Sequence, residues 1–247
     1  MTIKFSSKEI HFLKSESDEV DFLPPDNYFS DLIQDRSDQN RTDPVSHFEQ
    51  RLSNMQIPGD NFLCAVLQVD PKNPEDLLEQ AKDTVEATFN AVLDNDRGIW
   101  EMLNDTAFAI AFWDFSSEEK ALNLLTSLKE KIADSLDAKL LAGISFYPDH
   151  TFSKLDIFNN ALRAIDHAAF FGPGALHKFD ATSLNISADR LYQLGKYNKA
   201  IADYKKGLEL EPRNANLMNS LGVCFGITGD LDSAKEQFKN AAAVSPK

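Results

Sequence analysis

The pattern of apolar and polar positions between residues 61 and 180 changes repeatedly between the period of a strand and that of a helix. Short apolar or alternating runs predict strands, whereas apolar residues three and four positions apart predict amphipathic helices. The expected strands are 61–70, 98–103, 106–115, 138–148 and 175–180. The expected helices are 74–93, 116–136 and 152–172.

The order of these elements is strand, helix, strand, strand, helix, strand, helix, strand. Asn104-Asp105 separates two adjacent strands and suits a hairpin turn. The order predicts an α+β domain with an antiparallel-centred sheet, and we expect its helices to cover one face of that sheet.

After residue 180 the apolar pattern is helical and repeats with a period of 34 residues. Gly195 and Gly229 are 34 residues apart, and five further pairs keep this offset. These pairs are Tyr197 and Leu231, Ala200 and Ala234, Tyr204 and Phe238, Gly207 and Ala241, and Pro212 and Pro246.

Each residue type in this repeat has a physical reason. The small residues let two antiparallel helices approach closely, and the aromatic or branched residues are expected to fill the space between hairpins. The glycines fit turns between paired helices, and the prolines stop the second helix of each pair. The repeat closely resembles the tetratricopeptide repeat (TPR), which implies two helical hairpins, 181–214 and 215–247, that bind a partner protein.

In TPR proteins, one face of the first helix of each hairpin lines a concave binding surface. The resemblance places these residues on that face: Asn185, Asp189, Tyr192, Asn216, Asn219 and Val223. Asn219 fits a clamp for a C-terminal carboxylate, but Asp189 opposes one, so no such clamp is expected. Because about three repeats are usually needed for stability, we expect a longer array with further repeats outside this sequence. Alternatively, the two repeats lean on the preceding domain.

Three stretches of the region 43–180 carry a second resemblance. They are DPVSHFEQRL from Asp43, the strand LLAGISFYP, and the segment LDIFNNALRAIDHAAFFGPGALHKFD. In this order they resemble the GGDEF domain, the palm-like domain of bacterial diguanylate cyclases. The resemblance implies a nucleotidyl-cyclase palm-like fold over 43–180.

The residues that carry the chemistry of that family are changed here. An ungapped alignment puts Asn104-Asp105-Thr106-Ala107-Phe108 where the family has Gly-Gly-Asp/Glu-Glu-Phe. A metal-holding acid thus becomes Thr106, and the next glutamate becomes Ala107. On the first strand, Gln68-Val69-Asp70 replaces Asp-x-Asp. One carboxylate is too few to hold two Mg²⁺ ions on a triphosphate. We therefore expect a degenerate domain: not an enzyme, with no catalytic residues, no metal site and no cofactor.

Charge narrows the range of partners. The chain has 25 basic and 39 acidic side chains, a net charge of -14, so it repels nucleic acid and anionic membranes. No run reaches ~18 apolar residues and no signal peptide is evident, so we expect a cytoplasmic protein without a membrane span. Cys64 and Cys224 lie in apolar segments and are expected to be buried free thiols.

The remaining candidates for a site are weak. The five histidines are scattered, and none has a second ligand at metal spacing, so we expect structural roles for His11, His47, His150, His167 and His177. Residues 1–42 form an acidic segment, partly linker. Within it 3–13 could form a strand or a hairpin, and 26–35 a short helix with Tyr28, Phe29, Leu32 and Ile33 on one side. We expect this segment to dock on its own domain or to be disordered; a partner-binding motif is the alternative.

These patterns together predict a bacterial signalling scaffold. The TPR hairpins would recruit a partner protein, and the inactive GGDEF-like domain would dock or regulate. The alternative is a sensor of a guanine nucleotide or cyclic di-GMP that uses the degenerate pocket, and a third reading is an active nucleotidyl cyclase.

Overall fold

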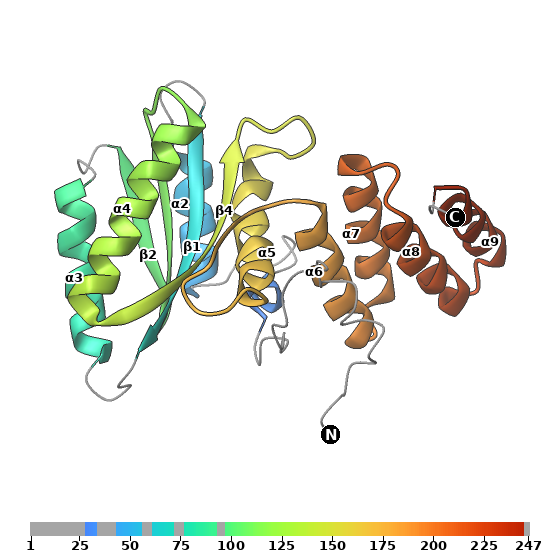
Figure 1. Cartoon of the computed structure of the whole chain (residues 1–247), viewed down its shortest axis with the longest axis horizontal. Coiled ribbons are helices and arrows are strands. Elements are labelled where there is room, and N and C mark those ends of the chain that lie inside the picture. The colour runs from blue at the N-terminus through green and yellow to red at the C-terminus, as the bar shows by residue number, and fades with distance from the viewer. Residues whose placement is uncertain (1–27, 34–42, 56–60, 72–76, 93–96, 245–247) are drawn as a thin grey trace.

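A computed structural model of the 247-residue chain describes residues 28–33, 43–55, 61–71, 77–92 and 97–244. The chain has two parts, a mixed sheet-and-helix domain and a row of helices that extends from its side (Figure 1). The fold is therefore α+β followed by an all-helical part, as the sequence predicts. Among the described residues, no helix is long and apolar enough to cross a membrane.

The sheet has five strands in the order β2-β3-β1-β4-β5. Its centre is β1 (Phe62–Pro71), which pairs antiparallel with both β3 (Ala107–Trp113) and β4 (Ala138–Tyr147). One edge is β2 (Gly98–Asn104), antiparallel to β3, and the other is β5 (Leu176–Lys178), parallel to β4. All five strands coincide with strands expected from the sequence, and the centre of the sheet is antiparallel.

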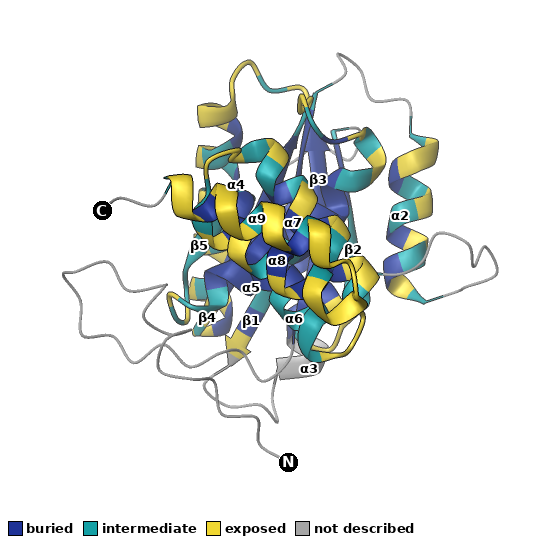
Figure 2. Ribbon diagram, turned by 90° about the vertical axis from the view of Figure 1, so that its right-hand side faces the viewer, coloured by how far each residue is buried: buried dark blue, intermediate teal, exposed yellow. Residues whose placement is uncertain are grey.

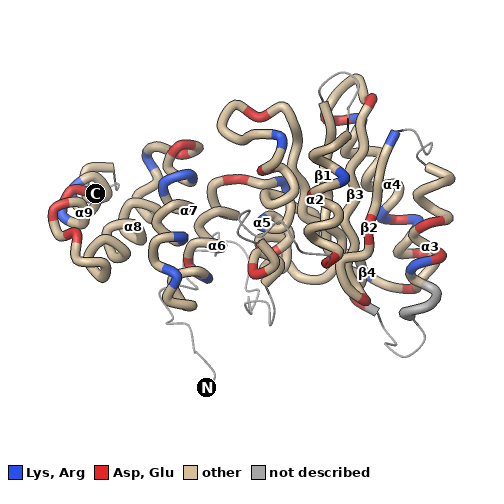
Figure 3. The backbone as a smooth tube through the Cα atoms, turned by 180° about the vertical axis from the view of Figure 1, so that it is seen from behind, with Lys and Arg blue, Asp and Glu red and all other residues tan. Residues whose placement is uncertain are grey.

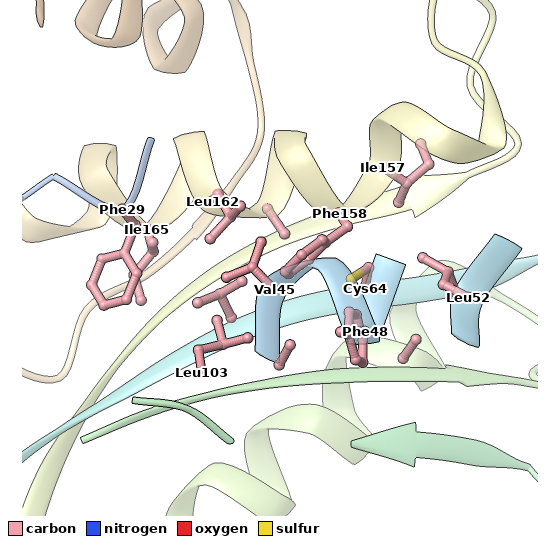
Figure 4. Close-up of a cluster of buried hydrophobic side chains, with 14 of the residues drawn as sticks. Phe29, Val45, Phe48, Leu52, Cys64, Leu103, Ile157, Phe158, Leu162 and Ile165 are labelled. Carbon is pink, nitrogen blue, oxygen red and sulfur yellow. The ribbon is translucent and has the colours of Figure 1, made fainter. Parts of the chain in front are cut away.

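Helices cover both faces of the sheet, so the expectation of one covered face was wrong. On one face lie α2 (Pro44–Asn54) and α5 (Ile157–Ala169), and on the other α3 (Leu77–Val92) and α4 (Glu118–Leu136). The reason is in β1, whose alternate side chains are apolar on both sides and so need an apolar cover on each. Figure 4 shows the cluster under α2 and α5.

The contact between α5 and β4 is unusually close. Gly143 lies in the middle of β4, and a Cβ atom built there would lie 2.0 Å from the backbone nitrogen of Ile165 and 2.5 Å from the carbonyl oxygen of Ala161. Both atoms belong to the backbone of α5, which cannot move away as a flexible side chain could. Glycine at this position therefore sets how deeply α5 sits on the sheet.

Part of the N-terminal segment packs on the sheet domain. Docking was one of the two outcomes expected for residues 1–42, and disorder was the other. The 3₁₀ helix η1 (Phe29–Leu32) lies against α5, and Tyr28, Phe29 and Ser30 are buried. The strand or hairpin expected over 3–13 lies outside the described residues.

The second part of the chain consists of two helical hairpins. The first joins α6 (Ala181–Gln193) to α7 (Tyr197–Leu210), and the second joins α8 (Ala215–Thr228) to α9 (Leu231–Val244). Figure 2, seen from the side of the hairpins, shows many exposed residues along α7, α8 and α9. The predicted turn glycines have left-handed backbones, with φ of +71° at Gly195 and +87° at Gly229.

Close helix packing in the repeats also follows the predicted small residues. A Cβ atom on Gly207 would lie 2.9 Å from Leu217 in the next hairpin. Ala200, Ala234 and Ala241 are buried. Pro212 follows the end of α7, whereas Pro246 lies outside the described residues. Cys64 and Cys224 are buried free thiols, as expected.

Replacing Gly143 with alanine is expected to lower the free energy of unfolding by about 3 kcal/mol, because the added methyl group overlaps the backbone of α5. Chemical denaturation of the full chain measures this change. The matched control is Gly226→Ala on α8, where no atom lies within 4 Å of the added group and helix propensity favours alanine by roughly 0.5–1 kcal/mol. Equal effects of the two substitutions would show that α5 does not rest on Gly143.

Candidate functional site

The outer side of α5 carries a row of polar residues, and the repeats pack against it. Asn159, Asn160, Arg163, Asp166 and His167 follow each other at helical spacing, and all but Arg163 are buried. In the sequence, this segment was identified by its helical apolar period and by its resemblance to a stretch of the GGDEF domain. The signal that the sequence analysis missed was a polar stripe on a helix whose other side is strongly apolar, which predicts a second packed neighbour.

An ion pair joins α5 to the first hairpin across α6. The guanidinium of Arg163 donates from Nε to Oδ2 of Asp203 at 3.2 Å and from Nη2 to Oδ1 at 3.0 Å. Ser187 on α6 donates its hydroxyl to Oδ2 of Asp203 at 2.8 Å. Because the pair is mostly buried and bidentate, its geometry fixes α7 relative to α5.

The same side of α5 holds η1 through Asp166. Its carboxylate accepts hydrogen bonds from the backbone nitrogens of Phe29 at 2.6 Å and Ser30 at 2.8 Å. Burial raises the pKa of Asp166 to about 7, although these N–H groups oppose the rise. Asp31 on η1 also pairs with Arg190 on α6 at 2.7 Å, so η1 bridges the two parts of the chain.

The residues predicted to line a concave surface are divided between two environments. In the first hairpin, Asn185 is only 8% exposed and donates to Oδ2 of Asp189 at 3.3 Å. The other oxygen of Asp189 accepts a hydrogen bond from the hydroxyl of Tyr204 at 2.5 Å. Tyr192 packs edge-on against Tyr197, with ring centroids 5.6 Å apart. Asn185 is therefore not part of an open surface, because α6 lies between α5 and α7.

The second hairpin presents its predicted residues to solvent. Asn216, Asn219 and Val223 on α8 are exposed. Ile227, one turn after Val223, is 49% exposed and extends the same row, although the sequence analysis did not single it out. We call these four residues the α8 face; it combines two amides with two aliphatic side chains along one side of a helix.

Two side chains of the repeat that were expected to fill the space between hairpins are exposed to solvent instead. Leu231 is 70% exposed and Phe238 is 43% exposed, so that expectation was wrong for the second hairpin. The equivalent Tyr204 is buried because α8 packs on α7, whereas no described helix packs on the outer side of α9. The ring of Phe238 instead covers Gly222 on α8, where a Cβ atom would lie 2.8 Å from it.

The hairpin between β2 and β3 holds the residues that stand in place of the GGDEF motif. The side-chain oxygen of Asn104 accepts hydrogen bonds from the backbone nitrogens of Thr106 and Ala107, both at 2.9 Å. Asn104 thus closes the turn with its own side chain, and Asp105 at the tip is exposed. The carbonyl of Thr106 accepts a bond from Val69 at 2.8 Å, which ties the turn to β1.

The first-strand residues of that site lie beside the hairpin. Gln68 pairs in register with Ala107, and Asp70 is exposed near the end of β1. Within the described residues, which leave out 72–76, Asp70 belongs to no group of three His, Cys, Asp or Glu side chains that could hold a metal ion. The loss of catalysis expected from these residues stays a prediction.

The expectation that all five histidines are scattered was wrong. His47 on α2 lies 3.0 Å from Glu101, and His150 is exposed in a loop. His167 and His177, however, stack with ring centroids 3.7 Å apart, and Asp180 lies beside them. The two histidines are ten positions apart in the sequence, so only the fold of the chain between them brings them together.

Asp203→Asn is expected to lower the free energy of unfolding by about 3 kcal/mol, because it leaves the buried guanidinium of Arg163 without its charge partner. Denaturation of the full chain tests this expectation, and Arg163→Met with the double variant completes a thermodynamic cycle. Asp114→Asn is the control, since its pair with Arg97 is exposed and 3.7 Å long and contributes less than about 1 kcal/mol. A coupling energy near zero would contradict a fixing role for the pair.

Solved structures of GGDEF domains are similar to the first part of the chain. The GGDEF domain of YfiN from Pseudomonas aeruginosa has a TM-score of 0.43 and 17% identity, covering 55% of this chain and 94% of that one. An EAL/GGDEF domain protein from M. capsulatus has a TM-score of 0.40 and 16% identity, covering 54% and 94%.

Two relatives match part of the chain in sequence. Protein bimA of Emericella nidulans is 27% identical over 97 residues, which is 39% of this chain and 11% of the relative. BBSome complex member bbs-4 of Caenorhabditis elegans is 36% identical over 67 residues, 27% of this chain and 14% of the relative. The chain thus spans only a small part of the length of both relatives. Residues 188–226 match the TPR repeat family, so the helical part of this chain carries a TPR repeat.

Proposed function

We propose that this protein is a non-catalytic scaffold whose TPR hairpins recruit a partner protein through the α8 face. The observation that supports the proposal is the exposure of Asn216, Asn219, Val223 and Ile227 along one side of α8; the first three lie within the matched repeat. Amides can hydrogen-bond to the backbone of a bound segment, and the aliphatic residues can bury its apolar side chains.

The charge of the helices agrees with a protein partner. Residues 181–247 carry 9 basic and 7 acidic side chains, whereas the rest of the chain is strongly acidic. Figure 3 shows both signs interspersed along α7 and α9. The α8 face itself has no charged member, so we expect binding there to depend mainly on shape and apolar contact and only weakly on salt.

The GGDEF-like domain serves in this proposal as a docking platform without turnover, in the cytoplasm of a bacterium. The substitutions at Gln68, Thr106 and Ala107 support it, since they remove the carboxylates that the family uses for its cations. The Arg163–Asp203 pair and the bridge made by η1 hold the first hairpin to the sheet domain, so the junction between the platform and the repeats is rigid.

Val223→Asp is expected to abolish capture of the partner, because it places a charge in the middle of the α8 face. The full chain is immobilised, exposed to a lysate of its source, and the retained proteins are identified by mass spectrometry. Ala202→Asp, which adds the same charge at an exposed position of α7, is the control and should retain the partner. A partner retained equally by both variants, with unchanged thermal unfolding, would contradict the α8 face as the binding surface.

Calorimetric titration of the full chain with GTP and with cyclic di-GMP, each with Mg²⁺, is expected to give no heat of binding at high micromolar nucleotide. The physical reason is that Asp70 is left without the second carboxylate of the family's first strand. Saturable binding with 1:1 stoichiometry that Asp70→Asn abolishes would contradict the loss of nucleotide binding at this site and favour a nucleotide sensor. Binding that persists in this variant would place a nucleotide elsewhere on the chain.

A further inference from the structure

Two histidines and an aspartate meet where the sheet domain joins the first hairpin. His167 lies in the last turn of α5, His177 lies in β5, and Asp180 caps the N-terminus of α6. One ligand atom of each residue lies within 4.8 Å of those of the other two. Among the described residues, this is the one group of three or more potential metal ligands that meets this distance.

The contacts of the two imidazoles indicate which ring nitrogen can bind an ion. Nδ1 of His177 lies 3.2 Å from the carbonyl oxygen of Lys178, which can only accept, so Nδ1 carries the proton and Nε2 keeps a lone pair. Donation from the other ring nitrogen to a carbonyl or carboxylate is the usual arrangement of a metal-binding histidine. Nδ1 of His167 lies 3.2 Å from Oδ1 of Asp180 and 3.3 Å from the hydroxyl oxygen of Ser183. An ion shared by His167 and Asp180 would therefore take the place of the proton on Nδ1 of His167.

Asp180 keeps one oxygen for a further ligand. The backbone nitrogen of Ser183 donates to its Oδ1 at 2.8 Å, and the Ser183 hydroxyl donates to the same oxygen at 2.9 Å. Within the described part of the chain, no hydrogen bond is directed to Oδ2. The carboxylate can thus cap α6 with one oxygen and present the other.

The two lysines near the group are held by partners outside it, and an aromatic ring covers the histidines. Nζ of Lys178 pairs with Glu118 and lies over Phe146, and Nζ of Lys129 donates to the carbonyl of Gly174 at 2.6 Å. Both lysine ammonium groups thus have partners other than His167, His177 and Asp180. Phe171 packs against both histidine rings, with centroids 5.6 and 5.1 Å away, and gives the group an apolar side.

We propose that His167, His177 and Asp180 form a binding site for a divalent transition-metal ion of the Zn²⁺ class at the junction of the two parts. Two imidazoles and one carboxylate are a donor set that such ions favour, with water in a fourth position. Bond lengths of about 2.0–2.2 Å require ligand atoms about 3.3 Å apart, so the side chains must rotate to close on the ion and the imidazole stack must open.

A bound ion would tie β5 to the start of α6, and so fix the angle at which the repeats leave the sheet domain. The site lies on different elements from the α8 face, and the proposal does not depend on the scaffold function. A metal at this position would rigidify the junction without touching a bound partner.

Titration of the full chain with Co²⁺ and Zn²⁺, after removal of metals with a chelator and dialysis, tests the site. We expect 1:1 binding with a micromolar dissociation constant, a visible absorption band typical of four-coordinate Co²⁺, and a rise in the thermal midpoint with added Zn²⁺. His177→Gln should weaken binding by at least about tenfold and abolish the Co²⁺ band. His150→Gln removes an exposed histidine outside the group and should leave both unchanged.

Asp180→Asn gives a second variant that should fold, because asparagine is also a good N-cap while lacking the charge that a cation needs. It should also weaken binding by at least about tenfold. The proposal is overturned if neither ion binds saturably below about 1 mM, or if binding is equally strong in His177→Gln, Asp180→Asn and His150→Gln. Circular dichroism of each variant establishes that a loss of binding is not a loss of fold.

Discussion

The buried ion pair between Arg163 and Asp203 is the interaction on which the arrangement of the two parts depends. Removing two charges from water is costly, and only close, bidentate geometry with a further hydrogen bond from Ser187 offsets the cost. An apolar contact would tolerate sliding of the first hairpin on α5, whereas this pair allows a narrow range of positions. The orientation of the first hairpin relative to the sheet is set in this way.

Helix α5 is consequently the central element of the molecule. Its apolar side rests on β4 at a distance that Gly143 alone permits, and its polar side holds η1, α6 and α7. The stacked histidines lie at the end of the same helix. One helix therefore stabilises the sheet domain, docks the N-terminal region and orients the repeats. A change in any of these contacts should alter the packing at the junction of the two parts.

This arrangement separates two surfaces that could serve function. The hairpin between β2 and β3 holds the residues that replace the family's catalytic motif, and Asn104 uses its own side chain to close that turn. The α8 face belongs to the second hairpin, beyond the helices that are fixed on α5. A partner bound to the α8 face would thus be held at a defined position relative to the sheet domain, as a scaffold requires.

The sequence by itself determined the strands, the helical hairpins and their turns, because these follow from local periodicity and from glycine at positive φ, as at Gly195 and Gly229. The resemblance to TPR proteins also placed Asn216, Asn219 and Val223 on an accessible helix face, and the structure exposes all three. Only the tertiary structure decided that helices cover both faces of the sheet, that Asn185 is buried, and that His167 meets His177. These outcomes depend on which elements pack together, and one helix placed between two others changes the environment of every residue on its surface.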